Sequence, residues 1–169
     1  GTGDATGDEG FSGGGHGNLD AHDLAITGSI PGIDGLNVGA GYYRANYDLV
    51  GSGDTKEEGT VYATYAYGPV TVGYQVGAVG GQGANPASYK NEYFGISYAV
   101  SDDVSISYNR TESLKIGAGY QKESEYDSLS LSYSVGGLTL NIADADCTHC
   151  GYTVDKKQDE RTVSMSIAF

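Results

Sequence analysis

The sequence predicts an all-β fold, an antiparallel up-and-down β-barrel that crosses a lipid bilayer with about nine strands. Three observations support this prediction. Apolar residues alternate with small polar residues along most of the chain, with the period of two that a strand requires. Turn-forming pairs such as Gly68-Pro69 and Gly136-Gly137 separate the alternating stretches. The 169 residues include 28 glycines and 15 tyrosines, which suit turns and strands respectively.

The stretch from Arg161 to Phe169 shows the alternation most clearly. Residues 163, 165, 167 and 169 are apolar and share one face of a strand, whereas residues 162, 164, 166 and 168 are small or polar. An aromatic residue at the last position fits a strand that closes a barrel, with the ring in the interfacial aromatic belt.

Nine stretches alternate in this way, most of them near the ~9–11 residues that a tilted strand needs to cross a bilayer. They cover about residues 24–30, 36–48, 59–67, 70–78, 93–100, 104–109, 128–135, 138–143 and 161–169. The phase of the second stretch changes at Tyr42 and Tyr43, so that Arg44 would turn inward, which predicts a β-bulge. Residues 1–19 are predicted to form a glycine-rich acidic loop, and residues 20–169 the strands.

The connections alternate between short and long. Tight turns are predicted at residues 31–35, 68–69, 101–103 and 136–137, and longer polar loops at residues 49–58, 80–88, 113–125 and 144–159. A meander with one short-turn rim and one long-loop rim has the anatomy of an outer-membrane barrel.

The polar face of each stretch carries small residues, whereas a soluble β-sandwich would expose lysine, glutamate and arginine there. Small polar side chains suit the interior of a wide barrel. Tyrosines gather where the two aromatic girdles of such a barrel would lie, although tyrosine also suits strands in general. The predicted lower girdle holds Tyr65, Tyr98 and Tyr133 beside Phe169, and the predicted upper girdle holds Tyr43, Tyr47, Tyr89 and Tyr126.

The formal net charge of −13 argues against binding of nucleic acid, whose phosphates need lysine and arginine. The two cysteines, Cys147 and Cys150, lack the second cysteine pair of a zinc site, the histidine of a haem site and the strand–helix setting of a redox motif. We predict that they form a small loop disulfide, with free thiols as the alternative.

No serine, histidine and aspartate arrangement supports an enzyme, and His22 between Asp20 and Asp23 is the nearest approach to one. No specific metal site is predicted. Loosely bound calcium is expected at acidic loops, because hard cations prefer oxygen ligands. The acidic residues assigned to these loops are Asp54, Glu57, Glu58, Glu123, Glu125, Asp155, Asp159 and Glu160.

From Asp20 to Phe169 the chain resembles the Gram-negative general diffusion porins, the alphaproteobacterial branch in particular. The resemblance rests on the motif Tyr93-Phe94-Gly95-Ile96-Ser97-Tyr98, on the aspartate-rich turn after Val100 and on the terminal Phe169. It implies an outer-membrane homotrimer of 16-stranded barrels, with Phe169 as an assembly signal. Because such barrels have an even strand number, we expect the nine strands to match the last nine of 16. An eight- or ten-stranded barrel is the alternative.

The resemblance further implies a water-filled channel for passive diffusion of small hydrophilic solutes and ions, with no cofactor and no covalent chemistry. Arg44, Arg110 and Arg161 would lie at the pore mouth, or else face solvent or lipid head groups. A mild cation preference, contact with lipopolysaccharide and use as a phage receptor are expected. The alternative is a non-pore outer-membrane barrel or a surface adhesin or receptor. The candidate pore-lining residues are Asn37, Thr71, Gln75, Ser105, Asn109, Ser128, Ser130, Ser132, Thr139, Asn141, Thr162 and Ser164.

Overall fold

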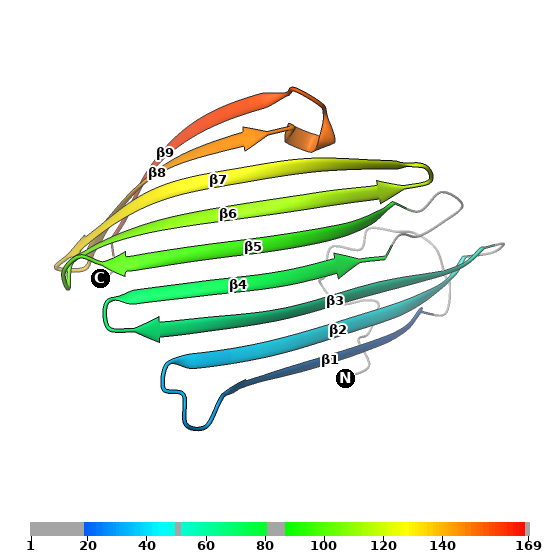
Figure 1. Ribbon diagram of the computed structural model, residues 1–169, viewed down its shortest axis with the longest axis horizontal. Coiled ribbons are helices and arrows are strands. Elements are labelled where there is room, and N and C mark those ends of the chain that lie inside the picture. The colour runs from blue at the N-terminus through cyan, green and yellow to red at the C-terminus, as the bar shows by residue number, and fades with distance from the viewer. Residues whose placement is uncertain (1–18, 50–51, 81–86, 168–169) are drawn as a thin grey trace.

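A computed structural model describes residues 19–49, 52–80 and 87–167 of the protein. They form one antiparallel sheet of nine strands, each hydrogen-bonded to the next in chain order (Figure 1). The predicted all-β, up-and-down architecture is therefore confirmed. The strands are β1 (Leu19–Ser29), β2 (Leu36–Leu49), β3 (Ser52–Tyr67), β4 (Val70–Val79), β5 (Ser88–Ala99), β6 (Val104–Gly117), β7 (Tyr120–Val135), β8 (Leu138–Thr148) and β9 (Lys157–Ile167), with a 3-10 turn, η1 (Cys150–Tyr152), between the last two.

The pairing brings apolar residues together across neighbouring strands. Ala40 of β2 lies opposite Ile26 of β1 and Val61 of β3, and the pattern continues to β9, where Val163 lies opposite Ile142. Because side chains alternate along each strand, all of these residues share one side of the sheet. We call this side the apolar face, and the opposite side, which carries residues such as Asn37 and Thr71, the polar face.

The predicted β-bulge at Tyr42 and Tyr43 is wrong. The register of β2 with both neighbours is unbroken along the strand, so Arg44 stays on the same face as Val38 and Tyr42. On this one face of β2, the residues are apolar in the middle of the sheet and polar toward the end of the strand. The strand does not rotate where the composition changes.

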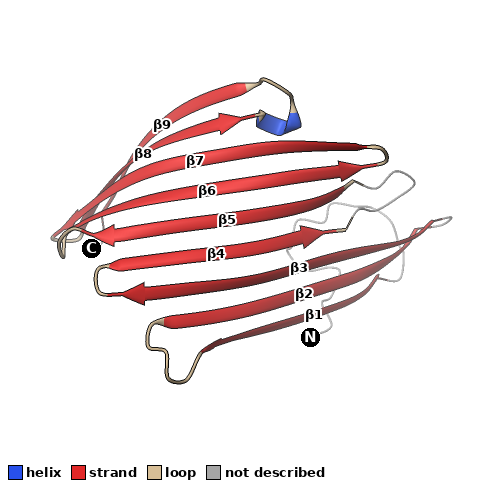
Figure 2. Cartoon of the chain, viewed as in Figure 1, coloured by secondary structure: helices blue, strands red, loops and turns tan. Residues whose placement is uncertain are grey.

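Two of the four predicted long loops are strands instead. Residues 52–58 continue β3 and residues 113–117 and 120–125 continue β6 and β7, so that β6 and β7 are joined by Ala118 and Gly119 alone (Figure 2). Polar residues there reflect strands that extend beyond the apolar part of the sheet, where polar side chains on both faces meet water. Longer connections join β4 to β5 and β8 to β9. The rim that carries the β6–β7 and β8–β9 connections is called the second rim below, and the other the short-turn rim.

The described sheet has almost no buried core. The buried apolar residues are Ala45, Cys147 and Cys150, whereas large side chains of the apolar face remain exposed even on inner strands, among them Val61 of β3 and Leu129 of β7, both at 57%. Exposed apolar area of this extent on a soluble domain would drive association. The apolar face is therefore built to be covered by something other than this sheet. None of the described residues form a helix long and apolar enough to cross a membrane.

The hairpin between β1 and β2 depends on a glycine in the left-handed region. Gly35 has a φ of 85°, and a Cβ there would lie 2.1 Å from the carbonyl oxygen of Ala66 on β3. The Ala66 N–H donates to the Gly35 carbonyl at 3.0 Å. Gly32 in the same turn also has a φ of 85°, but open space surrounds it. The predicted glycine-rich loop at residues 1–19 falls almost wholly, and Phe169 falls entirely, outside the described residues.

Candidate functional site

The polar face collects every candidate pore-lining residue. All twelve occupy positions of one parity in their strands, and the register places these positions on the same side of the sheet. Asn109, for example, lies opposite Gly95 and Ser128, and Ser132 lies opposite Ser105 and Asn141. Their role as pore lining is a prediction that this placement alone does not test. The common placement follows from the period of two, which is why the sequence could predict it.

Hydrogen bonds link many of these side chains along the polar face. The Gln75 amide donates to the Thr60 hydroxyl at 3.0 Å, and that hydroxyl donates to the Val76 carbonyl at 3.2 Å. Ser132 donates to the side-chain amide oxygen of Asn141, and the Ser134 and Thr139 hydroxyls lie 3.0 Å apart. The face is thus a wall of short, hydrogen-bonded polar groups.

Two tyrosines of the polar face are absent from the candidate pore-lining residues. Tyr62 lies over Gly39, where an added Cβ would come within 2.4 Å of the ring. Tyr93 borders a hollow of about 350 Å³ on this face, together with Thr60 and Asn91. Alternation along β3 and β5 places both residues opposite the apolar row, but the candidate list was restricted to smaller polar residues.

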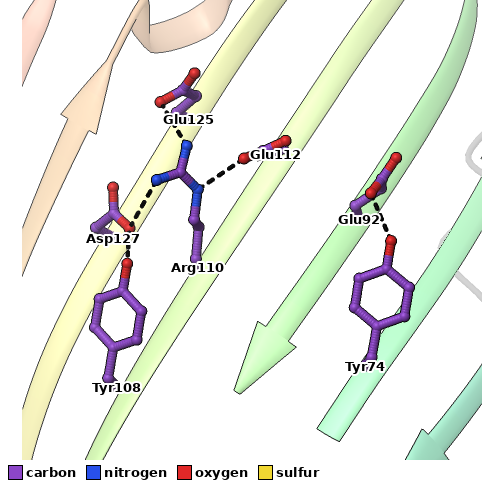
Figure 3. Close-up of polar contacts among 7 residues, drawn as sticks. All are labelled: Tyr74, Glu92, Tyr108, Arg110, Glu112, Glu125 and Asp127. Carbon is purple, nitrogen blue, oxygen red and sulfur yellow. Dashed lines mark hydrogen bonds and ion pairs between the residues drawn. The ribbon is translucent and has the colours of Figure 1, made fainter. Parts of the chain in front are cut away.

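A belt of charged and tyrosine side chains crosses the apolar face toward the second rim (Figure 3). Its centre is Arg110, which donates from Nε to Glu112 at 2.7 Å and from a terminal nitrogen to Glu125 at 3.2 Å, and lies 4.0 Å from Asp127. Tyr108 donates to Asp127 from below. We call this group, with its equivalents on the other strands, the charged belt.

The charged belt repeats one arrangement on three strand pairs. In each pair, the tyrosine lies on a strand that runs toward the second rim. It donates to a carboxylate on the neighbouring strand, and this carboxylate stands opposite the residue two positions after the tyrosine. Tyr42 reaches Glu57 at 3.1 Å, Tyr74 reaches Glu92 at 2.5 Å, and Tyr108 reaches Asp127. The fourth pair replaces this arrangement by a bidentate ion pair, in which Arg161 of β9 donates to both oxygens of Asp144 of β8 at 2.7 and 3.1 Å.

The belt is staggered relative to the rows of paired residues. The row that starts at Glu92 reaches Glu125 two strands later, but the tyrosine-bonded carboxylate is Asp127, two residues further along β7. The row from Asp127 reaches Asp159, but the belt uses Arg161, again two residues further along. From Glu92 to Arg161 this is a shift of one residue per strand, which matches the shear of barrels whose strands tilt about 36°. Between β5 and β9 the belt is therefore level if the strands tilt as barrel strands do.

The charged belt changes the interpretation of the arginines. Arg44, Arg110 and Arg161 all lie on the apolar face, each within 4.0 Å of a carboxylate. Since this is the face opposite the candidate pore lining, their placement favours the second of the two expectations, contact with solvent or lipid head groups. Without the predicted bulge, the expected inward turn of Arg44 is absent as well.

The predicted girdles are partly right. Tyr65, Tyr98 and Tyr133 lie on the apolar face near the short-turn rim and are 41–47% exposed. The predicted upper girdle is wrong, because Tyr43, Tyr89 and Tyr126 lie on the polar face. The side chain of Tyr47 lies outside the described residues. The aromatic residues of the apolar face at that height are instead Tyr42, Tyr74 and Tyr108 of the charged belt.

A disulfide links the end of β8 to the turn that follows it, with Cys147 in β8 and Cys150 in η1. Cys147 and Cys150 form a disulfide with Cα atoms 5.6 Å apart, and both residues are buried. His149 and Tyr152 adopt positive φ angles of 56° and 62°, which produce a compact turn. The turn brings Tyr152 back over the sheet, where its hydroxyl lies 2.7 Å from that of Ser113 on β6.

Two further expectations concern metals and catalysis. Among the described residues, no three His, Cys, Asp or Glu side chains are grouped so that they could hold a metal ion. The carboxylates assigned to acidic loops lie mostly in strands, and Glu57 and Glu58 point to opposite faces. His22 and Asp23 are consecutive residues of β1 and therefore also lie on opposite faces.

Comparison with known proteins gives similarity in structure only. No family model matches the sequence, and no curated protein matches it. A solved structure described as OmpT (in-vitro folded), an outer membrane protein of Vibrio cholerae, is similar over 87% of this chain and 52% of its own, with 12% identity and a TM-score of 0.66. The trimer form of OmpT (in-vitro folded) from the same organism matches over 87% and 54%, with 16% identity and a TM-score of 0.61.

The chain has the fold of an outer-membrane β-barrel. This confirms the predicted fold class and the outer-membrane setting that was predicted with it. The chain spans about half of the length of the two proteins that it matches. In this fold the apolar face meets lipid and the polar face points inward.

Proposed function

We propose that this chain forms part of a general diffusion porin, an outer-membrane barrel that encloses a water-filled path for small hydrophilic solutes and ions. The composition of the polar face carries the proposal. Among its described side chains, Val79 is the one aliphatic side chain larger than alanine. Serine, threonine, asparagine and glycine predominate, and several of them hydrogen-bond along the wall rather than across an interior.

Side-chain volume connects this composition with a pore. Small barrels of about eight strands are filled by the side chains of their inward face, and wider barrels leave an aqueous channel. Serines such as Ser130 and Ser132, and glycines such as Gly73 and Gly95, cannot fill an interior. The nine strands cover about half of the length of two outer membrane proteins, which supports the expectation that they belong to a barrel with more strands, 16 in the porins that the sequence resembles.

The charged belt fits the level of lipid head groups. Charges on the lipid-facing side of a barrel are costly near the bilayer midplane and cost little near the interfaces. Arg44, Arg110 and Arg161 are held by carboxylates at the height where the apolar face ends. At that height they would meet the phosphates of lipopolysaccharide, with the tyrosines directly below as the aromatic girdle.

We also propose a homotrimer, supported by the trimer form in which one of the similar proteins was solved. An SDS gel of unboiled protein tests this point, because a trimeric barrel should run as an oligomer and separate into single chains when boiled.

Conductance across a planar lipid bilayer tests the pore. Asn109→Trp would place a large ring on the polar face, beside Gly95, where an added Cβ would already lie 2.9 Å from the Asn109 side chain. The matched control is Ile106→Trp, on the apolar face of the same strand. We expect the first variant to lower the single-channel conductance and the second to leave it unchanged. A refolded, membrane-inserted protein that conducts no ions would favour a non-pore barrel or surface receptor instead.

A further inference from the structure

Tyr152, in the turn that follows Cys150, packs against the polar face near the second rim. The Tyr152 ring lies 5.8 Å from that of Tyr89 on β5, and its hydroxyl lies 2.7 Å from that of Ser113 on β6. Ser113 also donates to Asn91 at 2.5 Å. Ser113 and the residue opposite it on β7, Ser124, are 8% and 1% exposed. The turn therefore belongs to the inner wall at this height.

Two lysines face each other next to this turn. Lys115 of β6 lies directly opposite Lys122 of β7. This pair is two residues closer to the second rim than the pair Ser113 and Ser124, on the same face. The Lys115 ammonium lies 5.8 Å from the ring centre of Tyr89 and 5.7 Å from that of Tyr152. The Lys122 ammonium lies 6.0 Å from the ring centre of Tyr120.

The charges of these lysines are not neutralised. Within the part of the chain that the structure describes, no carboxylate lies within ion-pair distance of Lys115 or Lys122, whereas most other basic residues of the strands have such a partner. The paired ones are Arg44, Lys56, Lys90, Arg110 and Arg161. Tyrosine rings orient an ammonium through cation–π attraction but leave its charge in place.

Two facing lysines without a negative partner destabilise the sheet. Like charges directly opposite each other on neighbouring strands are destabilising, and this chain has 22 acidic residues from which partners could have come. A bound anion would remove the repulsion. The polar wall beside the lysines is otherwise closely packed: the hydroxyl oxygen of Ser124, two residues along β7 from Lys122, is buried and has no hydrogen-bond partner among the described residues.

We propose that Lys115 and Lys122, framed by Tyr89, Tyr120 and Tyr152, form a binding station for small phosphate-bearing solutes on the inner wall near the second rim. Each ammonium is a compact point charge with three donors, which suits phosphate oxygens. This proposal rests on the proposed pore function, since the polar face is then the wall along which solutes pass. It also modifies the expectation of a mild cation preference, because the net charge of −13 describes the whole chain and this station is locally basic.

Calorimetric titration of the detergent-refolded protein with inorganic pyrophosphate tests the station without requiring a pore. The variant Lys115→Gln/Lys122→Gln removes both charges, and Lys157→Gln, an exposed lysine at the start of β9, is the matched control. We expect the double variant to bind pyrophosphate at least tenfold more weakly, and the control to bind it as the original protein does. Wild-type binding should weaken as salt is raised, because the attraction is electrostatic.

Reversal potentials in a KCl gradient give the second readout, and the double variant should shift them toward cation selectivity. Absence of pyrophosphate binding to the original protein, or an equal loss in Lys157→Gln, would overturn the proposal. Loss of binding in the double variant, in a protein that conducts no ions, would keep the station and refute the pore instead. Heat-dependent migration on SDS gels checks that each variant has folded.

Discussion

Replacing Leu131 by arginine tests the assignment of the two faces directly. Leu131 lies on the apolar face of β7, opposite Ile106 and Ile142, and is 41% exposed. If this face meets lipid, Leu131→Arg puts a charge into hydrocarbon. Ser130, the preceding residue on the same strand, points to the polar face, so Ser130→Arg puts the same charge into the barrel interior.

The depth of Leu131 follows from its distance to the charged belt. It lies four residues closer to the short-turn rim than Asp127, which is about 14 Å along a strand at ~3.4 Å per residue. With a tilt of about 36° this corresponds to about 11 Å of depth, close to the middle of an apolar band about 25 Å tall. Arginine near the midplane of a barrel costs about 2–4 kcal/mol. The folding equilibrium should therefore fall by roughly 30- to 900-fold.

Urea titration of protein refolded into lipid vesicles measures this difference. We expect Leu131→Arg to lower the unfolding free energy strongly, and Ser130→Arg to change it little. Leu129→Arg, only two residues below Asp127, should have a smaller effect than Leu131→Arg because it lies closer to the interface. The assignment of the faces would be refuted if Ser130→Arg were the more damaging change, or if the two variants were equally stable.

Three further predictions concern the turns, the belt and the disulfide. Gly32→Ala should destabilise by roughly 1–2 kcal/mol through its left-handed backbone, and Gly35→Ala by clearly more, because its Cβ would also meet a carbonyl oxygen at 2.1 Å; equal urea midpoints would contradict this. Arg110→Gln should lower the urea midpoint more than Arg161→Gln does, most visibly at low salt, because it leaves three neighbouring carboxylates without their shared cation; salt-independent midpoints would argue against it. Reducing the disulfide should expose residues 148–156 to protease while heat-dependent gel migration is retained, since a small closed loop stabilises only locally; loss of the folded band would show a wider role.

The alternation of side chains was sufficient to predict the faces. Each strand carries enough apolar residues to orient it, so Asn37, Thr139 and Ser164 could be assigned to one side of a sheet without coordinates. The prediction failed where the composition of the two faces is inverted. Along β2 beyond Tyr42, Arg44 lies on the apolar face whereas Tyr43 and Ala45 lie on the polar face, and this inversion was mistaken for a bulge.

Strand length was also underestimated for a physical reason. Residues 52–58 and 113–125 are rich in polar residues, which resembles a loop in a single sequence, although Leu114 and Ile116 continue the apolar face of β6. Backbone hydrogen bonding to a neighbouring strand does not require apolar side chains, however, so these residues continue as hairpins. The charged belt lies at the base of these extensions, and its tyrosines could have been recognised by combining parity with height.

The sequence by itself determined the fold class, the order of the strands and which residues share a face, because the period of two is a property of each strand alone. It did not determine which residues stand opposite each other. That depends on the register between strands and on a turn that returns over the sheet. Only the tertiary structure placed Arg110 among three carboxylates, Lys115 opposite Lys122, and Tyr152 against Ser113. Register is set by the hydrogen bonds between neighbouring strands and by the geometry of the turns that join them, and the alternation within one strand carries no information about either.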